Sequence, residues 1–400
     1  MRYRTTRSTR SRRGQILTPP GLAERVAESL RVTSGDWLEL GSGSGRLIEA
    51  CVGSRSMDRY VAVELDERLA ASSPRAPEIE LHCTDVLQPR ALSAVLGNTR
   101  FSCVLGNPPF GVDKLPHEAQ ARLQALYPDV QVIKGWARLD IYFMLESLAR
   151  LDRPGEAAFI VAAPVVQDQT LSSFRRTLVE SASEIECYEL PAKTFDKRAE
   201  VQSFLLIARF GCKQGATVTL GRLSGEAFEI TETRRVSRVE AVRRMDLADH
   251  EFQDFGLALS RKGDFTNLRD LGASICRGSR SRLQFETMEI ENFHTSDFPL
   301  DGGGVSFGRD ACNEFQTASA GHILLPRVGT RCIDRGAIVA KGRRAFTEAV
   351  FRLDVPARAR TSAFDWMQSD NGREWRRRAA HGSCAKHLTV ATLLAMPVPA

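Results

Sequence analysis

The segment Asp36-Trp37-Leu38-Glu39-Leu40-Gly41-Ser42-Gly43-Ser44-Gly45 decides the fold that we expect for this chain of 400 residues. Its first half is mostly apolar and predicts a buried strand, and residues 46–52 predict a helix. A strand, a glycine-rich loop and a helix in this order are typical of a nucleotide-binding α/β domain. The glycines let a ligand approach the backbone, while the loop amides and the helix N-terminus face it. The segment therefore predicts a Rossmann-like cofactor site.

Spacing within and after this loop separates the cofactor classes. The loop reads G-x-G-x-G, and Arg46 stands where a dinucleotide fingerprint needs its third glycine. Glu39 would repel a pyrophosphate and would instead suit an ammonium group. Glu64 follows a second expected strand and can accept both hydroxyls of a ribose, and Asp85 follows a third, near the place of an adenine amino group. A cofactor with an ammonium group, a ribose and an adenine but no phosphate is S-adenosyl-L-methionine. Glu64 or Asp85 taken singly fits a solvated strand-end carboxylate better, and the two carry weight together, at these spacings after a glycine loop.

A second segment, Asn107-Pro108-Pro109-Phe110, follows an apolar run at 100–105 that predicts another buried strand. Two prolines remove two amide donors, so the backbone carbonyls there lack a local partner. The Asn107 side chain adds a second carbonyl oxygen, and Phe110 adds a flat apolar face. Two acceptors beside a stacking ring suit a planar substrate with an exocyclic amino group. The alternative interpretation is a Pro-Pro turn closed by a core phenylalanine.

Composition excludes several classes of protein. With 42% hydrophobic and 26% charged residues the chain is ordinary for a soluble globular protein, and no apolar run approaches membrane-spanning length. Nine cysteines without a C-x-x-C pair argue against a disulfide framework and against a zinc site. We therefore expect a reduced, cytoplasmic protein that is a monomer and holds no metal.

Charge and pattern divide the chain into parts. Residues 1–13 hold six of the 55 basic residues and no acid, which leaves 49 basic against 49 acidic residues elsewhere. We interpret 1–13 as a flexible basic arm that contacts phosphates. Residues 14–245 predict the cofactor-binding domain, 246–262 a charged linker or crossing helix, and 263–400 a second, mildly basic domain.

The order of expected elements predicts the architecture of both domains. Strands and helices alternate in the first domain, which indicates a doubly wound α/β sheet, closed by a hairpin of 204–210 and 216–220. The second domain predicts a mixed α/β fold with a glycine loop at 302–304. Its expected strands are 268–276, 323–327, 332–333, 337–340 and 349–353.

In this order the motifs resemble the gamma-group, TaqI-like adenine-N6 DNA methyltransferases. The resemblance implies that Asn107, Pro108 and Phe110 are catalytic, and that Phe110 and Phe195 contact a target base that leaves the duplex. It also implies a set of cofactor-binding residues: Thr18, Glu39, Gly41, Gly43, Gly45, Glu64, Asp85 and Asn107. Phe110 stands where many relatives have tyrosine.

The resemblance extends into the second domain and implies that residues 263–400 recognise double-stranded DNA. The stretches 275–281, 322–331 and 386–389 are similar to parts of the family's target-recognition domain. The implied DNA-binding residues are Arg280, Arg327, Thr330 and Arg331.

The family implies an enzyme that transfers a methyl group from S-adenosyl-L-methionine to adenine N6, within a restriction-modification or related system and with a cognate restriction endonuclease as a partner. Two alternatives stay open. An RNA or protein (glutamine) N-methyltransferase shares the Asn-Pro-Pro motif and the cofactor fold. A DNA-binding subunit with an inactive methyltransferase half is the other.

Overall fold

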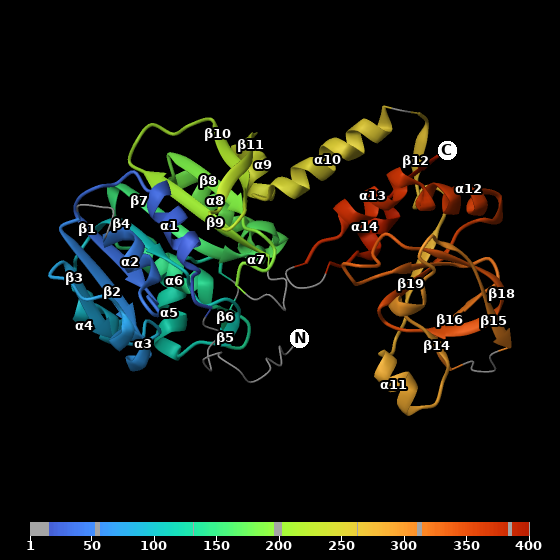
Figure 1. Ribbon diagram of the computed structural model, residues 1–400, viewed down its shortest axis with the longest axis horizontal. Helices are drawn as coiled ribbons and strands as arrows, with labels where there is room; N and C mark the ends of the chain where they lie inside the picture. Colours follow the sequence, from blue (N-terminus) through green and yellow to red (C-terminus); the bar gives the residue numbers. More distant parts are fainter. Residues whose placement is uncertain are drawn as a thin grey trace. The chain divides into compact units, whose positions relative to one another are not determined.

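The computed structural model describes residues 16–52, 57–130, 132–195, 202–261, 263–309, 314–382 and 386–399. The predicted basic arm, 1–13, lies outside these residues. The chain divides into two compact units, one ending at Leu247 and the other beginning at Ala248 (Figure 1). None of the helices in the described ranges combines the length and the apolar character that crossing a membrane requires.

The first unit is built on a nine-stranded sheet of order β11-β10-β8-β9-β7-β4-β1-β2-β3. β1 pairs in parallel with β2 and β4, β2 with β3, and β4 with β7, whereas β9 is antiparallel to both β7 and β8. The strands are β1 (Asp36–Leu40), β2 (Arg59–Glu64), β3 (Ile79–Cys83), β4 (Phe101–Gly106), β7 (Leu151–Ala162), β8 (Glu184–Glu189), β9 (Ser203–Phe210), β10 (Thr217–Ser224) and β11 (Glu229–Ser237).

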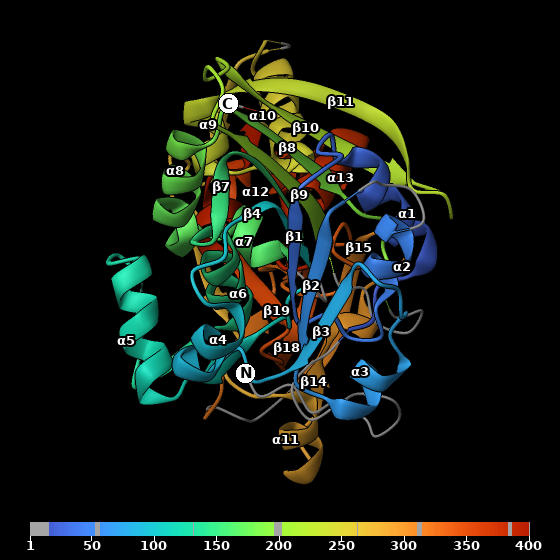
Figure 2. The same ribbon diagram turned by 90° about the vertical axis from the view of Figure 1, so that its left-hand side faces the viewer.

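Helices cover both faces of this sheet, because its central strands are apolar on both sides. In β1, Leu38 and Leu40 belong to one core and Trp37 to the other, as the period of two in a strand requires. Figure 2 shows α1 and α2 on one side of the sheet and α4 to α8 on the other. The helices are α1 (Pro20–Ser29), α2 (Arg46–Val52), α3 (Glu67–Ser72), α4 (Pro89–Leu96), α5 (His117–Leu126), α6 (Leu139–Leu148), α7 (Ala163–Gln167), α8 (Ser172–Ser181) and α9 (Arg238–Arg243), with a 3-10 turn at Gln169–Leu171.

Local sequence explains how the helix next to the site begins. α1 starts at Pro20, where the missing amide hydrogen costs nothing because the first turn has no intrahelical acceptor for it. Its buried residues Leu22, Ala23, Val26 and Ala27 recur at helical spacing and pack on the sheet. This packing fixes the segment before α1, residues 16–19, above the end of β4.

A short two-stranded ribbon follows the Asn107–Phe110 segment. β5 (Val112–Lys114) pairs antiparallel with β6 (Trp136–Arg138), and α5 lies between them in the chain. Residues 133–136 add a tight turn to the ribbon, since Ile133 N and Trp136 N each donate to the other residue's carbonyl oxygen.

The second unit contains a seven-stranded sheet in which β13-β19-β17-β18-β14 form the main path and β15 and β16 pair with β18. Its strands are β13 (Ser274–Arg277), β14 (Asn292–Phe293), β15 (Gly303–Arg309), β16 (Thr317–Ser319), β17 (Ile323–Pro326), β18 (Ala337–Phe346) and β19 (Val350–Asp354). A separate pair consists of β12 (Phe265–Asn267) and β20 (Pro397–Pro399). The helical elements are α10 (Leu247–Ser260), α11 (Arg282–Thr287), α12 (Ala357–Gln368), α13 (Asp370–Ala379) and α14 (Val390–Leu394), with a 3-10 turn at Thr295–Asp297.

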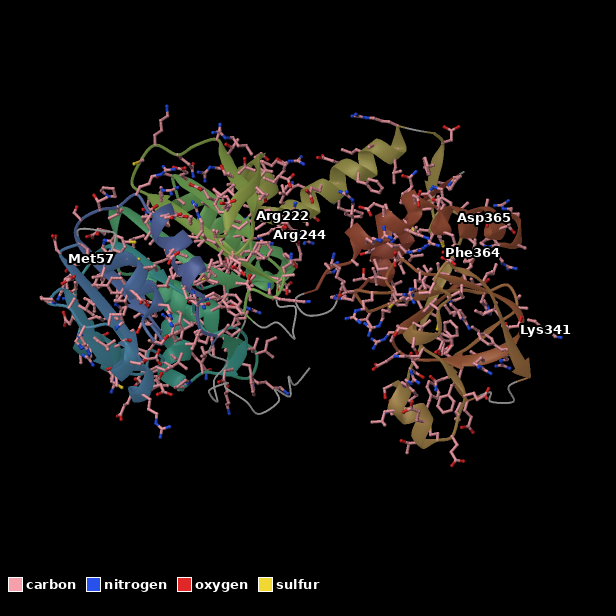
Figure 3. The ribbon with its side chains drawn as sticks, viewed as in Figure 1. Met57, Arg222, Arg244, Lys341, Phe364 and Asp365 are labelled. Carbon is pink, nitrogen blue, oxygen red and sulfur yellow. The ribbon has the colours of Figure 1, made fainter. Side chains whose placement is uncertain are left out.

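Alternating side chains of this second sheet also form two cores. Ile323 and Leu325 of β17 pack with α12 to α14, whereas Leu324 packs on the other side. On α12, Phe364 is buried against this core and its neighbour Asp365 is exposed (Figure 3). The predicted α/β class of the first unit and the mixed α/β class of the second are confirmed.

Several predicted elements are wrong in detail. The hairpin of 204–210 and 216–220 does not form, because β8 lies between β9 and β10; the hairpin is instead β10 with β11. Of the two interpretations of 246–262, a linker or a crossing helix, the structure has the helix: α10, whose Phe252, Phe255 and Leu259 recur at helical spacing and pack in the second unit's core.

Three predictions in the second unit also need correction. Cys332 and Ile333 are buried from a turn rather than from a strand. The glycine loop at 302–304 ends early, since β15 begins at Gly303 and pairs with β18. In the predicted strand 268–276, only the end from Ser274 belongs to a strand. Buried apolar residues such as Cys332 and Ile333 occur in turns as well as in strands, so an apolar pattern alone does not distinguish the two.

Candidate functional site

Four of the predicted site residues of the first unit, Glu39, Glu64, Asp85 and Asn107, lie at or just after the carboxyl ends of adjacent parallel strands. β1 lies between β2 and β4, and the chain order along the sheet reverses between β1 and β4. In open α/β sheets, such a switch point opens a crevice outside the strand ends, where ligands bind. Glu39, Glu64, Asp85 and Asn107 are therefore brought to one edge of the sheet.

The glycine loop after β1 adopts a backbone that needs glycine. Gly41, Gly43 and Gly45 have φ values of +79°, +58° and +77°, in the left-handed region. Gly41 N donates to Val63 O at 2.7 Å, which fastens the loop to the end of β2. A Cβ on Gly41 would also approach Phe143 Cε1 to 3.2 Å. The three glycines thus let the loop backbone lie directly against the end of β2 and the Phe143 ring.

Glu64 locks this loop in place. Its side chain is buried, and its Oε2 accepts from Gly43 N at 2.7 Å. Oε1 accepts from Leu65 N and Asp66 N, both at 2.9 Å. A carboxylate offers about four lone-pair sites, so it can accept from a ribose hydroxyl in addition to these amides.

Glu39 is buried in an unusual electrostatic state. Its side chain is 2% exposed and accepts from the Tyr60 hydroxyl at 2.7 Å. Burial raises the pKa of Glu39 to about 8; the nearby Glu64 carboxylate also raises it, and the Tyr60 hydrogen bond lowers it. Near neutral pH, Glu39 is therefore largely uncharged. A cation bound beside it would offset the cost of burying a negative charge, and Glu39 would then ionise.

A backbone hydrogen bond joins the residue before Asp85 to Glu64. Thr84 N donates to Glu64 O at 3.0 Å, which continues the alignment of β2 and β3 beyond their ends. The Asp85 side chain is partly exposed, and its Oδ1 accepts from Leu87 N at 3.0 Å. The structure thus places this carboxylate at the same sheet edge as the glycine loop.

Asn107 is held in one orientation by the segment that precedes α1. Its Nδ2 donates to Ile16 O at 2.9 Å and to Thr18 Oγ1 at 3.1 Å. Because both neighbours act as acceptors, the nitrogen of the amide must face them. The opposite atom, Oδ1, is buried and accepts from no donor within the described ranges. A buried carbonyl oxygen without a donor is costly unless a ligand supplies one.

Two aromatic rings that the resemblance assigns to the target base are in contact with each other. Phe110 and Phe195 meet edge to face, with ring centroids 5.9 Å apart and an interplanar angle of 87°. Both rings are partly exposed at the margin of the core under α1 and α2. Pro108 between Asn107 and Phe110 is buried. The structure therefore brings together Phe110 and Phe195, which the resemblance predicted to contact one target base.

Sequence reasoning missed three partners of the site: Tyr60, the Ile16 carbonyl and Phe143. Tyr60 is a polar-tipped residue in an apolar strand, which hints at a buried hydrogen bond. Its partner could not be named, because Tyr60 pairs with Trp37 across the strands and reaches Glu39 only diagonally. Ile16 acts through its backbone, and Phe143 through its ring, so neither leaves a signal in sequence.

In the second unit, three separate stretches meet around Glu348. Glu348 N donates to Arg280 O at 2.8 Å, and Arg327 Nε donates to Glu348 O at 2.7 Å. Arg277 Nη2 donates to the Glu348 carboxylate at 2.9 Å. Gly329 N donates to Lys386 O at 3.0 Å, which joins the third stretch. We call Arg277, Arg280, Arg327, Arg331 and Lys386 the basic cluster.

Members of the basic cluster differ in what they can do. The side chains of Arg280 and Arg331 are exposed, as is Thr330. Arg327 is partly buried, and burial lowers its pKa, helped by the neighbouring Arg277. Its guanidinium holds β19 through Glu348 O, so Arg327 has a structural role beside the predicted contact with DNA.

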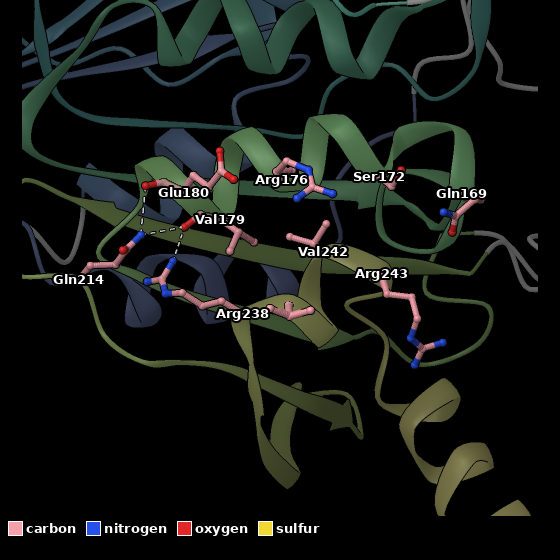
Figure 4. Close-up of a pocket in the computed structure, with 10 residues that line it drawn as sticks. Gln169, Ser172, Arg176, Val179, Glu180, Gln214, Arg238, Val242 and Arg243 are labelled. Carbon is pink, nitrogen blue, oxygen red and sulfur yellow. Dashed lines mark hydrogen bonds between the residues drawn. The ribbon is translucent and has the colours of Figure 1, made fainter.

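A cavity of about 480 Å³ lies elsewhere in the first unit, among α8, α9 and Gln214 (Figure 4). Arg238 and Gln214 there donate to the carbonyl of Val179 and to that of Ala182, which caps the last turn of α8. Because these polar groups serve the helix end, the cavity adds nothing to the site at the strand ends.

Comparisons with known proteins place the fold. No protein-family model matches the chain, and a search of curated proteins gave no match. The type IIG restriction endonuclease BpuSI is similar over 98% of this chain and 59% of its own, with 11% identity and a TM-score of 0.52. A methyltransferase subunit of a type I restriction-modification system from Streptococcus thermophilus is similar over 64% of this chain and 55% of its own, with 17% identity and a TM-score of 0.43.

A class I S-adenosylmethionine-dependent methyltransferase from Listeria monocytogenes is similar over 54% of this chain and 68% of its own, with 17% identity and a TM-score of 0.43. The likeness to BpuSI, at 11% identity and a TM-score of 0.52, shows a shared fold. The chain spans 59% of the BpuSI chain. The sheet of the first unit, followed in the chain by a second unit, has the Rossmann-like architecture predicted from the sequence.

Proposed function

We propose that this chain is an S-adenosyl-L-methionine-dependent methyltransferase that modifies adenine N6 in double-stranded DNA. The observation that carries the proposal is the state of Asn107. Its amide nitrogen is used twice, and its Oδ1 is buried and accepts from no donor within the described ranges. An amino group of a substrate is the donor that this oxygen lacks.

The residues around the glycine loop fit the cofactor. The three glycines put no side chain between a ligand and the loop backbone, Glu64 at the end of β2 is an acceptor for ribose, and Glu39 can pair with an ammonium group. Asp85 supplies an acceptor at the adenine end of the edge. S-adenosyl-L-methionine would supply an activated methyl group in the form of a sulfonium.

Chemistry at the target follows from what the chain presents. An adenine amino group is a poor nucleophile, because its lone pair is delocalised into the ring. Asn107 Oδ1 and the Pro108 carbonyl oxygen would each accept a hydrogen bond from this amino group. These two bonds move the nitrogen lone pair toward sp³ character. The edge-to-face pair of Phe110 and Phe195 offers a face on which an extruded base stacks, which offsets part of the cost of unstacking.

The second unit supplies the contact with DNA in this proposal. The exposed Arg280, Thr330 and Arg331 suit base edges or phosphates. The likeness to a type IIG restriction endonuclease supports a restriction-modification system, in which a cognate endonuclease is the partner of the modification activity.

Methyl transfer to three classes of substrate tests the proposal. Purified protein is incubated with labelled S-adenosyl-L-methionine and genomic DNA, RNA or a bacterial protein extract, and digested products are identified by mass spectrometry. We expect N6-methyladenine in DNA. Asn107→Ala should lose about a hundredfold or more of this activity and retain cofactor binding, whereas Asn98→Ala in an exposed turn of the same unit should not.

If the methyl label appears in RNA or in protein glutamine but not in DNA, then RNA or protein, and not adenine in DNA, is the substrate. Binding of DNA without transfer to any of the three classes would identify a DNA-binding subunit with an inactive methyltransferase half.

A further inference from the structure

The β5–β6 ribbon begins directly after the candidate catalytic segment and has a face that no core covers. Gly111 separates Phe110 from β5, and Leu139 N, at the start of α6, donates to Gly111 O at 3.0 Å. Both ends of the ribbon are therefore fastened beside the Asn107–Phe110 segment.

Strand pairing assigns the side chains to two faces. Asp113 lies opposite Ala137, which is buried in the core, so this pair faces inward. Lys114 lies opposite Trp136, and Val112 lies opposite Arg138, so these four share the outer face.

The turn of the ribbon extends this face. Ile133 N donates to Trp136 O at 3.1 Å, and Trp136 N donates back at 2.9 Å. Lys134 and Gly135 between them have φ values of +52° and +84°, as both central residues of a type I′ turn require. This turn sets Ile133 opposite Trp136.

The outer face exposes large apolar groups together with cations. Val112 is 54% exposed, Ile133 65% and Trp136 50%. Of the four tryptophans, Trp37 and Trp375 are buried and Trp366 packs against the core of the second unit. Lys114 and Lys134 are exposed around Trp136, whereas Asp140 is buried and paired with Arg138. An exposed aromatic ring flanked by lysines is costly in water and suits a base next to phosphates.

We infer that the outer face of the β5–β6 ribbon contacts the DNA next to the extruded adenine, with Trp136 stacking on a nucleobase and Lys114 contacting a phosphate. This inference rests on the proposed function, because it places the duplex beside Asn107 and Phe110. The outer face continues directly from that segment and carries cations and apolar groups but no acid among its described residues.

Binding of duplex DNA by the full chain tests the inference. Trp136→Ala should weaken binding about 5- to 150-fold, the range of base–aromatic stacking, and Trp136→Phe should recover most of it. Lys114→Ala should lower the salt dependence of binding by about one ionic contact. The control Lys213→Ala, an exposed lysine that follows β9, should leave both unchanged.

Tryptophan fluorescence gives a readout that does not depend on activity. Stacking on a base should quench the emission of the wild type when DNA is added, and Trp136→Phe should remove this change. Cofactor affinity and thermal stability should stay at wild-type values in each variant, since Trp136 and Lys114 are exposed.

Equal DNA affinity and equal quenching in wild type and Trp136→Ala, in a protein that methylates DNA, would overturn the inference and leave the proposed function standing. A wild type that neither binds nor methylates DNA would overturn both.

Discussion

The side-chain nitrogen of Asn107 donates a hydrogen bond of 3.1 Å to the hydroxyl of Thr18, a residue 89 positions earlier in the chain. The Ile16 carbonyl accepts a second bond from the same nitrogen. With both acceptors in place the amide cannot turn over without breaking two hydrogen bonds, so Oδ1 keeps its direction. The segment before α1 thus positions the group that we propose to receive the target amine.

Thr18→Val tests this arrangement. The substitution keeps the shape of the buried side chain but removes the acceptor, so Asn107 is held by one bond instead of two. We expect the rate of methyl transfer in a single turnover to fall about tenfold, the value of a hydrogen bond of about 1–1.5 kcal/mol. Thr18→Ser keeps the hydroxyl and should restore the rate. A Thr18→Val protein as fast as wild type would show that Ile16 alone suffices.

Glu39 predicts a dependence of stability on pH. Its pKa of about 8 in the folded chain exceeds its ordinary value of 4.5, so between these values the folded chain keeps a proton that the unfolded chain has lost. The free energy of unfolding should therefore fall as pH rises from about 4.5 to about 8, with a slope of at most about 1.4 kcal/mol per pH unit from this group.

Urea denaturation at several pH values measures this slope. Glu39→Gln should flatten it, because the amide does not titrate and can still accept from Tyr60. The control Glu24→Gln, on the exposed side of α1, should keep the wild-type slope. A Glu39→Gln protein with an unchanged slope would assign the pH dependence to other groups.

Glu64→Ala should weaken binding of S-adenosyl-L-methionine about tenfold or more, because a charge-assisted hydrogen bond of about 1.5–3 kcal/mol to the ribose is at stake. It should also lower the melting temperature, since the amides of Gly43, Leu65 and Asp66 lose their acceptor. Calorimetry measures the affinity, with the exposed Glu67→Ala of α3 as the control. Unchanged affinity in Glu64→Ala would move the ribose site elsewhere.

Arg327 and Arg331 should respond differently to alanine. Arg331 is exposed, so Arg331→Ala should leave thermal stability unchanged and reduce DNA binding. A lost base contact costs about 1–3 kcal/mol at one position of the target sequence, whereas a lost phosphate contact weakens all duplexes evenly and lowers the salt slope. Arg327→Ala should in addition lower the melting temperature, because its guanidinium holds Glu348 O.

Melting curves and binding to target and scrambled duplexes at several salt concentrations measure both effects. Wild-type affinity and salt slope in Arg331→Ala would remove Arg331 from the interface.

The sequence determined the parts of this protein that depend on neighbouring residues. The strand, glycine loop and helix at 36–52 are a local pattern, since the apolar run, the loop backbone and the helix start each follow from residue type. The same holds for Asn107 to Phe110, whose prolines and amide define the chemistry that the chain can offer. Parallel order then places Glu39, Glu64, Asp85 and Asn107 at one sheet edge, as expected.

Only the tertiary structure decided which distant groups meet. β8 separates β9 from β10 because strand order depends on which edges pair, and an apolar pattern carries no record of that choice. Residues 277–280, 327–331 and 386 are joined around Glu348 partly by backbone hydrogen bonds, which any residue type can make, and partly by the side chains of Arg277 and Arg327. The pairs Glu39–Tyr60 and Asn107–Thr18 likewise depend on strand register and on packing. Register and packing are properties of the whole fold, and no local stretch of sequence encodes them.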